Sequence, residues 1–380
     1  MRPLNNRILK FIVAFLVVVT SLATAYGERA RFELTVNNTW STTTHPGLFP
    51  NGAHFSWLAG GTHDSSVSFW REGELASPGV TQMAETGFTT GLVDEISAAA
   101  SVGQANGSVN WDWWFCPAET TGGACSDLVV EFDVDDSFPL VTLATMLGPS
   151  PDWFVGVDSL PLADANGWIT DQSVELFPYD GGTRSNDDVW NLGGPQNDPP
   201  EPVSLITTQS GQLVGPGSLG QFVFRQVSFD CDFDGDLTCD AADINMLLAE
   251  GDVSTGVAGG NPQFDLTGDG MIDNDDLDAW LDEAAYAAGF DSPFKYGDAN
   301  LDGSVDVTDF NLWNSANFTA NSRWDLGDFN GDGVTDTSDF NLWNTNNFTS
   351  SDIAAVPEPT GWSLLIFGLV AYVFRRRSVL

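Results

Sequence analysis

An acidic repeat in the second half of the chain limits the possible folds more than any other feature of the sequence. The residues that start at Gly297 align with those that start at Gly327, which gives a period of 30 residues. Both copies contain the spacing D-x-N-x-D-G with a further aspartate at loop position 12, and two looser copies precede them. A repeat of this period predicts small units, each a loop and a short helix, that stack on one another.

Each copy places oxygen-bearing side chains at alternate positions of a tight loop, which is the arrangement that surrounds a calcium ion. Calcium takes roughly six to eight oxygen ligands, and a glycine at loop position 6 permits the sharp turn. The expected ligands of the first and second loops are Asp232, Asp234, Asp236 and Asp243, then Asp265, Thr267, Asp269 and Asp276. Those of the third and fourth are Asp298, Asn300, Asp302 and Asp309, then Asp328, Asn330, Asp332 and Asp339.

The first two loops each depart from the pattern at one position. Thr267 replaces a carboxylate or amide in the second loop, and Leu237 stands where the first loop should have glycine. A disulfide between Cys231 and Cys239 would restore part of the stiffness that the missing glycine removes. The alternative, acidic loops that only keep the chain soluble, does not explain a spacing that recurs four times.

The repeats resemble type I dockerin and related bacterial calcium repeats over residues 230–348. The resemblance rests on aspartate rather than glutamate at position 12, on the pairing of the repeats and on the aromatic short helix after each loop. It implies small α-helical EF-hand or dockerin-like calcium repeats over residues 228–350. It also implies a cohesin-like partner that docks onto their helices.

The charge of the chain excludes several classes of partner. Its 53 acidic and 13 basic residues give a net charge of −40, and 27 of the acidic residues lie between Asp230 and Asp352. Nucleic acids and anionic membrane surfaces bind basic patches, so neither is an expected partner, whereas divalent cations are. The abrupt rise in acidity after Val227 predicts a domain boundary there.

The residues before that boundary, 29–227, have the pattern of half-buried β-strands. Apolar and polar residues alternate from Arg31 to Val36 and again from Gln221 to Arg225. A period of two indicates strands with one buried face. The best helical candidate runs from Met83 to Ala100. We therefore expect a mainly β fold, an antiparallel β-sandwich with one or two helical insertions, followed by the small helical repeats.

Three passages of this first part resemble the spondin domain of F-spondin and mindin. They are Thr44-His45-Pro46 before Ala53-His54-Phe55-Ser56, then Pro149 to Leu160, then Leu176 to Thr183, in the order and spacing of that family. The resemblance covers about Arg29 to Val227. It implies a β-sandwich of the kind found in extracellular-matrix and adhesion proteins, with a calcium ion held by loop carboxylates.

Carried over position by position, the resemblance implies three calcium ligands in this part, Asp133, Asp152 and Asp180. Arg184 stands where the family has a further aspartate. Either Asp187 or Asp188 replaces that ligand, or the site holds calcium more weakly.

Both ends of the chain have the features of targeting segments. Basic residues precede an apolar stretch from Phe11 to Ala25 that ends in a small-x-small pattern, which predicts a signal peptide over residues 1–25. At the other end a Pro-Glu-Pro motif precedes an apolar run from Trp362 to Phe374 and three arginines. This layout resembles the PEP-CTERM sorting tail, which implies a transient membrane anchor over residues 356–380 and a membrane sorting machinery as partner. A plain C-terminal anchor is the alternative.

The four cysteines form two sequence-local pairs, Cys116 with Cys125 and Cys231 with Cys239. In an exported chain such pairs predict two short disulfide loops. Neither pair has the CxxC spacing or the accompanying histidines of a zinc site.

Two further sets of side chains each allow a functional and a packing role. The three histidines, His45, His54 and His63, lie in passages dense with Trp and Phe, so we expect them to pack rather than to bind zinc. Trp111, Trp113 and Trp114 fit either a sugar-stacking platform or packing beside Cys116, and we expect packing. Since no nucleophile with a nearby base is visible, the sequence predicts no enzyme.

Together these features predict a secreted or cell-surface calcium-binding protein with an adhesive role. Its spondin-like part would contact a surface protein or a glycan such as an exopolysaccharide. The alternative is an accessory subunit of a polysaccharide-degrading assembly, held there by the repeats.

Overall fold

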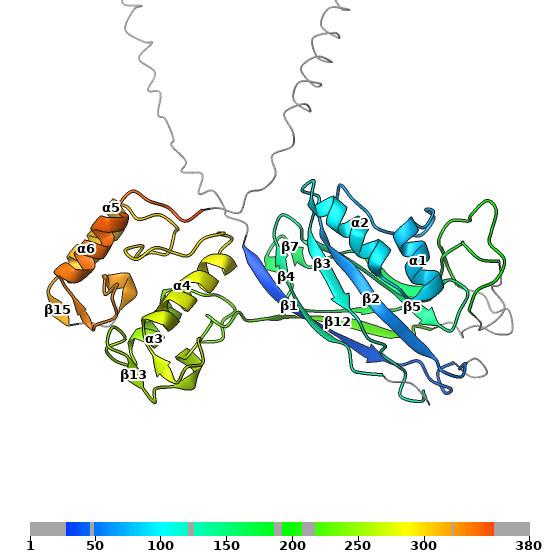
Figure 1. Ribbon diagram of the computed structural model, residues 1–380, viewed down its shortest axis with the longest axis horizontal. Helices are drawn as coiled ribbons and strands as arrows, with labels where there is room; N and C mark the ends of the chain where they lie inside the picture. The colour runs from blue at the N-terminus through cyan, green and yellow to red at the C-terminus, as the bar shows by residue number, and fades with distance from the viewer. Residues whose placement is uncertain are drawn as a thin grey trace, which may run out of the picture.

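The computed structural model of the chain describes residues 28–45, 49–120, 125–185, 192–206, 217–320 and 323–352. Two parts lie side by side along its long axis (Figure 1). We call residues 29–227 the sandwich and residues 228–352 the repeat segment. The predicted signal peptide, residues 1–25, and the predicted sorting tail, residues 356–380, lie outside the described residues. Within the described ranges, no helix is both long and apolar enough to cross a membrane.

One sheet of the sandwich contains four antiparallel strands in the order β4-β1-β12-β9. Their bounds are β1 (Arg29–Asn38), β4 (Val129–Asp135), β9 (Asp171–Glu175) and β12 (Gly220–Val227). The predicted alternation is confirmed in β1, where Ala30, Phe32 and Leu34 are buried. Successive side chains of a strand point to opposite faces, so Arg29 and Arg31 lie on the other face of this sheet.

The second sheet contains six strands in the order β11-β10-β6-β5-β2-β3. Their bounds are β2 (His54–His63), β3 (Ala105–Trp111), β5 (Leu140–Gly148), β6 (Trp153–Pro161), β10 (Tyr179–Asp180) and β11 (Ser204–Leu205). A short hairpin joins β7 (Ala163–Asp164) and β8 (Gly167–Trp168). Strand β5 is buried along almost its whole length, because other elements cover both faces of this sheet.

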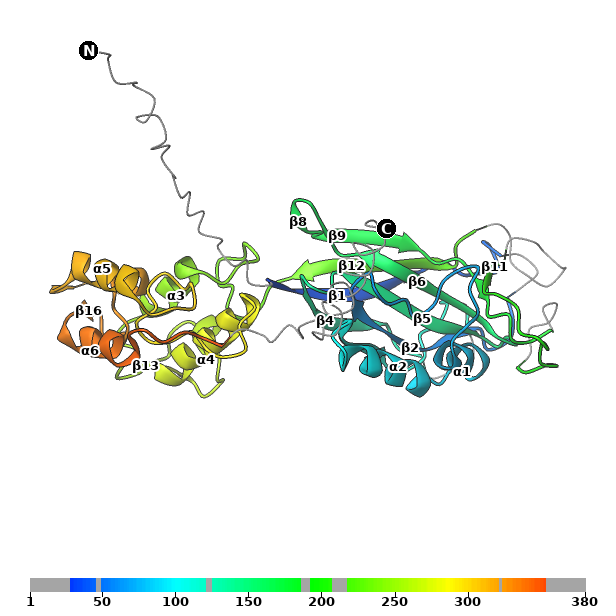
Figure 2. The same cartoon turned by 90° about the horizontal axis from the view of Figure 1, so that it is seen from above.

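Two helices, α1 (Pro78–Thr86) and α2 (Thr90–Ala100), cover the outer face of the six-stranded sheet (Figure 2). One apolar core lies between the two sheets, and a second lies between the six-stranded sheet and the helices. The single helix predicted from Met83 to Ala100 is wrong, because Gly87 ends α1 in a left-handed conformation (φ 74°). The prediction of a mainly antiparallel β fold with helical insertions is confirmed.

The repeat segment places one helix after each acidic loop. The helices are α3 (Ala241–Leu248), α4 (Asn274–Ala287), α5 (Val307–Ala316) and α6 (Thr337–Asn346). Two-stranded pairs join β13 (Val257–Ala258) to β14 (Met271–Ile272) and β15 (Thr319–Ala320) to β16 (Val334–Thr335). Short 3-10 turns are η1 (Pro262–Phe264) and η2 (Trp324–Leu326). The segment has an apolar core of its own around Trp280, Trp324 and Phe329.

Both predicted disulfides are confirmed. Cys116 is bonded to Cys125 in the loop after β3, and Cys231 is bonded to Cys239 across the first acidic loop.

Candidate metal centres

The aspartate at position 12 of each loop is buried and ties the loop to its helix. In the third loop, one carboxylate oxygen of Asp309 accepts hydrogen bonds from the amides of Ala299 (2.8 Å) and Asn300 (3.4 Å). Its other oxygen accepts from the amide of Asp306 at 2.7 Å. The equivalent aspartates, Asp243, Asp276 and Asp339, are also almost fully buried and accept from the equivalent position-9 amides. The position-12 aspartates therefore organise the loops in addition to offering oxygen ligands.

The aspartate at position 9 caps the helix that follows each loop. These residues, Asp240, Asp273, Asp306 and Asp336, accept from the amide two residues ahead and form a reciprocal capping box with position 12. Sequence reasoning missed this role. The signal was present, because an acidic pair three residues apart before a helix is the spacing of a capping box.

The aspartate at position 1 curls the loop around itself. One oxygen of Asp298 accepts from the amide of Gly303 at 2.9 Å, and the other accepts from the amide of Asp302 at 3.2 Å. The position-1 aspartates of the other loops accept from the same position-6 amide, as Asp232, Asp265 and Asp328 show. The same kind of backbone turn therefore occurs in each of the four loops.

The first loop makes this turn without its glycine. Leu237 has a φ of 73°, beside 88° for Gly270, 84° for Gly303 and 82° for Gly333 at the same position. A leucine in this left-handed region is strained, since its Cβ crowds the following carbonyl. The loop nevertheless brings oxygens of Asp232, Asp234 and Asp236 within 4.8 Å of one another.

The charges of these loops fit a cation. Burial, and then the nearby charges of Asp309 and Asp302, raises the pKa of Asp298 to about 8. Burial and the charge of Asp339 raise the pKa of Asp328 to about 7, and one buried oxygen of Asp328 has no hydrogen-bond partner. A calcium ion would offset the repulsion and give that oxygen a partner.

The third and fourth repeats are interlocked. The indole nitrogen of Trp313 donates to the carbonyl of Asp336 at 2.9 Å, and that of Trp343 donates to the carbonyl of Asp306 at 2.9 Å. Each helix thus holds the loop of the other repeat. The chain after each helix also pairs with the opposite loop, through Phe318 to Thr335 and Phe348 to Val305.

In the sandwich, Asp152 and Asp180 lie close together at one end of the six-stranded sheet. Asp152 directly precedes β6 and is fully buried. Its carboxylate accepts from the amide (2.7 Å) and hydroxyl (3.0 Å) of Thr183 and from the amide of Arg184 (2.9 Å). Asp180 pairs with Trp153 across β10 and β6 and accepts from the amide of Gly182 at 2.7 Å.

The structure does not bring Asp133, the third expected ligand, to this pair. Asp133 lies on β4 of the other sheet, where Arg31 donates to it at 2.9 Å and the Tyr286 hydroxyl donates at 3.0 Å. Asp133 instead faces the repeat segment, since its carboxylate accepts from Tyr286 of α4.

A positive charge occupies the place of the missing aspartate. Arg184 pairs with Glu85 of α1 and also donates to the carbonyl of Gly194 at 2.9 Å. Asp187 and Asp188, the possible replacements, lie outside the described residues. In the described part of the chain, the candidate site in the sandwich therefore consists of Asp152 and Asp180.

The three histidines occupy separate places. His45 is buried and bonds Thr44, and His63 is buried between Thr142 and the carbonyl of Asp64. Burial lowers the pKa of both, so both are neutral at pH 7.

The two tryptophans after β3, Trp113 and Trp114, lie outside the core, and Trp114 has the loop-packing role that the sequence predicts. Trp113 is 51 % exposed and Trp114 is 41 % exposed. Trp114 stacks on the ring of His54, with centroids 4.0 Å apart, and the His54 ring is itself fixed by the carbonyl of Gly52 at 2.7 Å. This stack is therefore a rigid aromatic surface.

Comparison with known proteins finds relatives of the sandwich. Residues 30–212 match the family model described as Spondin_N. Spondin-2 of Homo sapiens is 34 % identical over 186 residues, which is 48 % of this chain and 54 % of the relative. Spondin-2 of Rattus norvegicus is 35 % identical over 159 residues, which is 41 % of this chain and 46 % of the relative.

Spondin-1 of Rattus norvegicus is 34 % identical over 160 residues, which is 41 % of this chain and 19 % of the relative. The chain thus spans about half the length of the Spondin-2 relatives and about a fifth of that of Spondin-1. The match covers the motifs that suggested the resemblance, and it ends before the repeat segment begins. Over residues 30–212, this chain is therefore similar to the spondin N-terminal domain.

Proposed function

We propose that this protein is an exported, non-catalytic, calcium-binding protein of the cell surface or extracellular matrix, which adheres to its ligand through the spondin domain. The match of residues 30–212 to the spondin N-terminal domain carries the proposal. The signal peptide over residues 1–25 and the sorting tail over residues 356–380 supply its route of export. Residues 29–227 and 228–350 are its two working domains.

Calcium is the proposed ligand of the four loops. The oxygens at loop positions 1, 3, 5 and 12 would hold it in an EF-hand-like or dockerin-like manner, and the ion supplies positive charge where buried carboxylates repel one another. Asp152 and Asp180 are the proposed oxygens of a further site in the sandwich. Asp133 is left out of that site, because Arg31 and Tyr286 engage its carboxylate.

The exposed aromatic surface is where we place the contact with the ligand. Trp114 and His54 form one exposed stack, and Phe88, 54 % exposed, packs edge-on against Trp57 of the same strand as His54. Exposed aromatic side chains of this size are typical of binding surfaces. The proposed ligand is a surface protein or a glycan such as an exopolysaccharide.

A glycan array and a cell-adhesion assay, each with calcium and with chelator, test this function. We expect the full chain to bind in calcium and the Trp113→Ala, Trp114→Ala double variant to lose that binding. Val102→Ala, which removes an exposed apolar side chain near the end of α2, is the matched control. Equal binding by the double variant and the control would place the ligand elsewhere. No binding by the wild type in either assay would contradict the adhesive role.

One observation favours a second function, an accessory subunit of a polysaccharide-degrading assembly. Phe318 is 72 % exposed and Phe348 is 85 % exposed, and they occupy equivalent positions of the third and fourth repeats. Two equivalent exposed phenylalanines suit a partner that docks onto the repeats, such as a cohesin-like module. Pull-down of a cohesin by the wild type, and its loss in the Phe318→Ala, Phe348→Ala double variant, would favour this function.

A further inference from the structure

A dense set of contacts joins the start of β1 to the end of α4. The guanidinium of Arg29 donates to the carbonyls of Tyr286 (3.2 Å) and Phe290 (3.3 Å) and to the carboxylate of Asp291 (3.2 Å). It also lies over the ring of Tyr286, 4.3 Å from its centroid. The arginine side chain is only 8 % exposed. Arg29 therefore caps the C-terminal end of α4, where the unpaired carbonyls of a helix favour a cation.

A second arginine of β1 takes part in the same contact. We call this contact, formed by Arg29, Arg31, Asp133, Glu283 and Tyr286, the joint. Arg31 donates to Asp133 at 2.9 Å, lies 3.5 Å from the carboxylate of Glu283 in α4, and stacks over the ring of Phe229. The hydroxyl of Tyr286 reaches the second oxygen of Asp133 at 3.0 Å. Asp133 is thus shared between a strand arginine of the sandwich and a helix tyrosine of the repeat segment. Burial raises the pKa of Tyr286 to about 12, so its hydroxyl keeps the proton that it donates.

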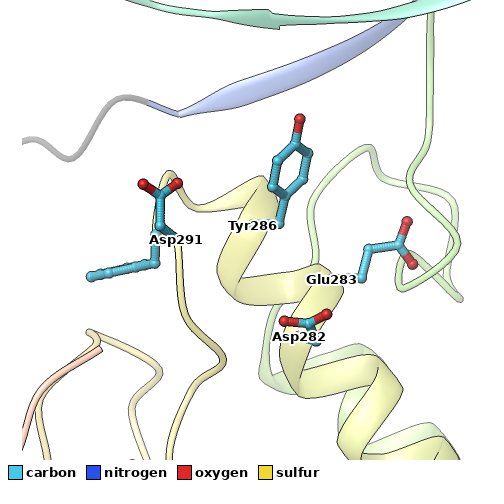
Figure 3. A pocket seen from close by; sticks show the side chains of 5 residues that line it. Asp282, Glu283, Tyr286 and Asp291 are labelled. Atoms are coloured by element: carbon cyan, nitrogen blue, oxygen red, sulfur yellow. The ribbon is translucent and has the colours of Figure 1, made fainter. Parts of the chain in front are cut away.

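Figure 3 shows the face of α4 that receives the arginines, with Tyr286 rising toward β1 and Asp291 beside the start of that strand. Asp282, Glu283, Tyr286, Phe290 and Asp291 line a cavity of about 340 Å³ there. Only seven basic residues occur between residues 28 and 352, and two of them, Arg29 and Arg31, lie at this joint. The two arginines of β1 therefore face the carboxylates of Asp291 and Glu283, so opposite charges meet at this contact.

The same helix begins at the second acidic loop. Asp273 caps its N-terminus, and Asp276, the position-12 aspartate, sits in its first turn. Helix α4 is 14 residues long, or about 21 Å at 1.5 Å per residue. One helix therefore runs from the second loop to the joint, whereas the fourth loop begins a different helix, α6.

We infer that calcium in the second loop is coupled to the sandwich through α4 and the joint formed by Arg29, Arg31, Asp133, Glu283 and Tyr286. The inference rests on the proposed calcium binding. By thermodynamic linkage, the formed joint raises the calcium affinity of the second loop by some factor. Calcium bound to that loop then raises the equilibrium constant for forming the joint by the same factor.

Hydrogen–deuterium exchange of the full chain, with calcium and with chelator, tests the coupling. In the wild type, calcium should slow exchange of the paired amides in the first half of β1 and the second half of β4 by about 5-fold to about 150-fold, the usual range of coupling between two sites. Asp276→Asn should abolish the effect. Asp339→Asn, in the loop that begins α6, should retain it.

The joint itself is tested with Arg31→Ala and with the conservative Tyr286→Phe, which removes one hydroxyl and leaves the ring in place. Both should weaken the effect of calcium on β1 and β4. Arg225→Ala is the matched control, because this arginine of β12 is 61 % exposed and pairs with Asp171 of β9. It should leave the effect of calcium unchanged.

Calorimetric titration with calcium separates the two proposals. If calcium does not bind the wild type, the proposed function fails. If calcium binds and exchange in β1 and β4 is unchanged, or if the effect persists in Arg31→Ala and Tyr286→Phe, the coupling is wrong. Equal loss in Asp276→Asn and Asp339→Asn, with helicity retained in both, would also overturn it.

Discussion

At the residue scale, Leu237 is the clearest departure from a local rule. Three of the four loops use glycine for the left-handed residue at position 6, and the first uses leucine in the same conformation. The loop keeps its shape because its ends are fixed. The Cys231–Cys239 disulfide bridges the loop, and the carboxylate of Asp232 accepts a hydrogen bond from the amide of Leu237 at 2.9 Å. The covalent bridge and the hydrogen bonds thus hold a backbone conformation that leucine itself disfavours.

Two reciprocal substitutions test whether leucine is strained at loop position 6. Leu237→Gly should stabilise the repeat segment in calcium by about 1 kcal/mol, because it removes the strain of a left-handed leucine. Gly270→Leu should destabilise it by about 1–2 kcal/mol, since its φ of 88° is strained for leucine while no atom lies within 4 Å of the added Cβ. Thermal unfolding of both variants in calcium gives the measurement. A loss of stability in Leu237→Gly would show that the leucine side chain contributes more by packing than its backbone costs.

The raised pKa of Asp298 predicts opposite pH dependences with and without calcium. Burial raises this pKa to about 8, against about 3.9 for an unfolded aspartate. The folded segment without calcium therefore binds the proton more tightly, so its stability is greatest below about pH 4 and is lost as the pH rises through about 8. In chelator, helicity should be lower at about pH 8 than at about pH 5, measured by far-UV circular dichroism.

In saturating calcium the sign should reverse, because protons and calcium compete for the same oxygens. The same chain should then lose helicity as the pH falls. Equal helicity at both pH values in chelator would contradict the buried, mutually repelling carboxylates. The Asp298→Asn, Asp328→Asn double variant serves as the control, since an amide at either position does not titrate.

At the element scale, the third and fourth repeats form one unit through exchanged contacts. Each indole donates to the carbonyl of the capping aspartate of the other repeat. Aromatic rings of α5 and α6 also pack against one another at a tilt, Phe310 with Trp343 and Trp313 with Phe340. Gly327 also lies so close to Trp313 that a Cβ would stand 2.7 Å from its Cα. Glycine is required at that approach, and Gly297 meets Trp343 in the same way.

These exchanged contacts predict that a change in one repeat weakens calcium binding by the loop of the other. Trp313→Phe removes the hydrogen bond to Asp336 and should lower the calcium affinity of the fourth loop about fivefold, the equivalent of about 1 kcal/mol. Trp343→Phe should do the same to the third. Calorimetric titration in an Asp243→Asn, Asp276→Asn, Asp309→Asn background, where the first three loops are disabled, isolates the fourth. In that background, an effect of Trp343→Phe as large as that of Trp313→Phe would contradict the exchange.

Local sequence patterns predicted strands of the sandwich and the helices of the repeats, but not the contacts between distant parts of the chain. Alternation predicted β1 and β12 because a buried face imposes a period of two, and the calcium spacing located the helices because each helix starts at a loop. The joint of Arg29 with α4 was not predictable, since it brings together residues more than 250 positions apart. Asp133 was misassigned for the same reason. Its partner Tyr286 lies in a segment whose position relative to the sandwich no local pattern encodes.

At the scale of the whole molecule, negative charge is unevenly distributed. About half of the 53 acidic residues lie between Asp230 and Asp352, where Lys295 and Arg323 are the only basic residues. The apolar core of the repeat segment is small and must hold these charges together. Calcium would remove most of the repulsion within each loop.

Chelation should therefore expand the repeat segment while the sandwich stays folded. Small-angle X-ray scattering of the full chain should give a larger radius of gyration in chelator than in calcium. The near-UV circular dichroism of the buried sandwich tryptophans should persist. A radius of gyration that is the same in both conditions would mean that the disulfide and the apolar core alone hold the segment.

The position of β12 also has a mechanical consequence. Its last residue, Val227, leads through residues 228–231 directly into the first loop, and the strand is hydrogen-bonded on one side to β1 and on the other to β9. A pull on the repeats acts along β12 and at right angles to these hydrogen bonds, which loads both ladders in shear instead of opening them one bond at a time. In an optical trap, the repeats should unravel at low force, and β12 should hold the sandwich closed until a much higher force is reached.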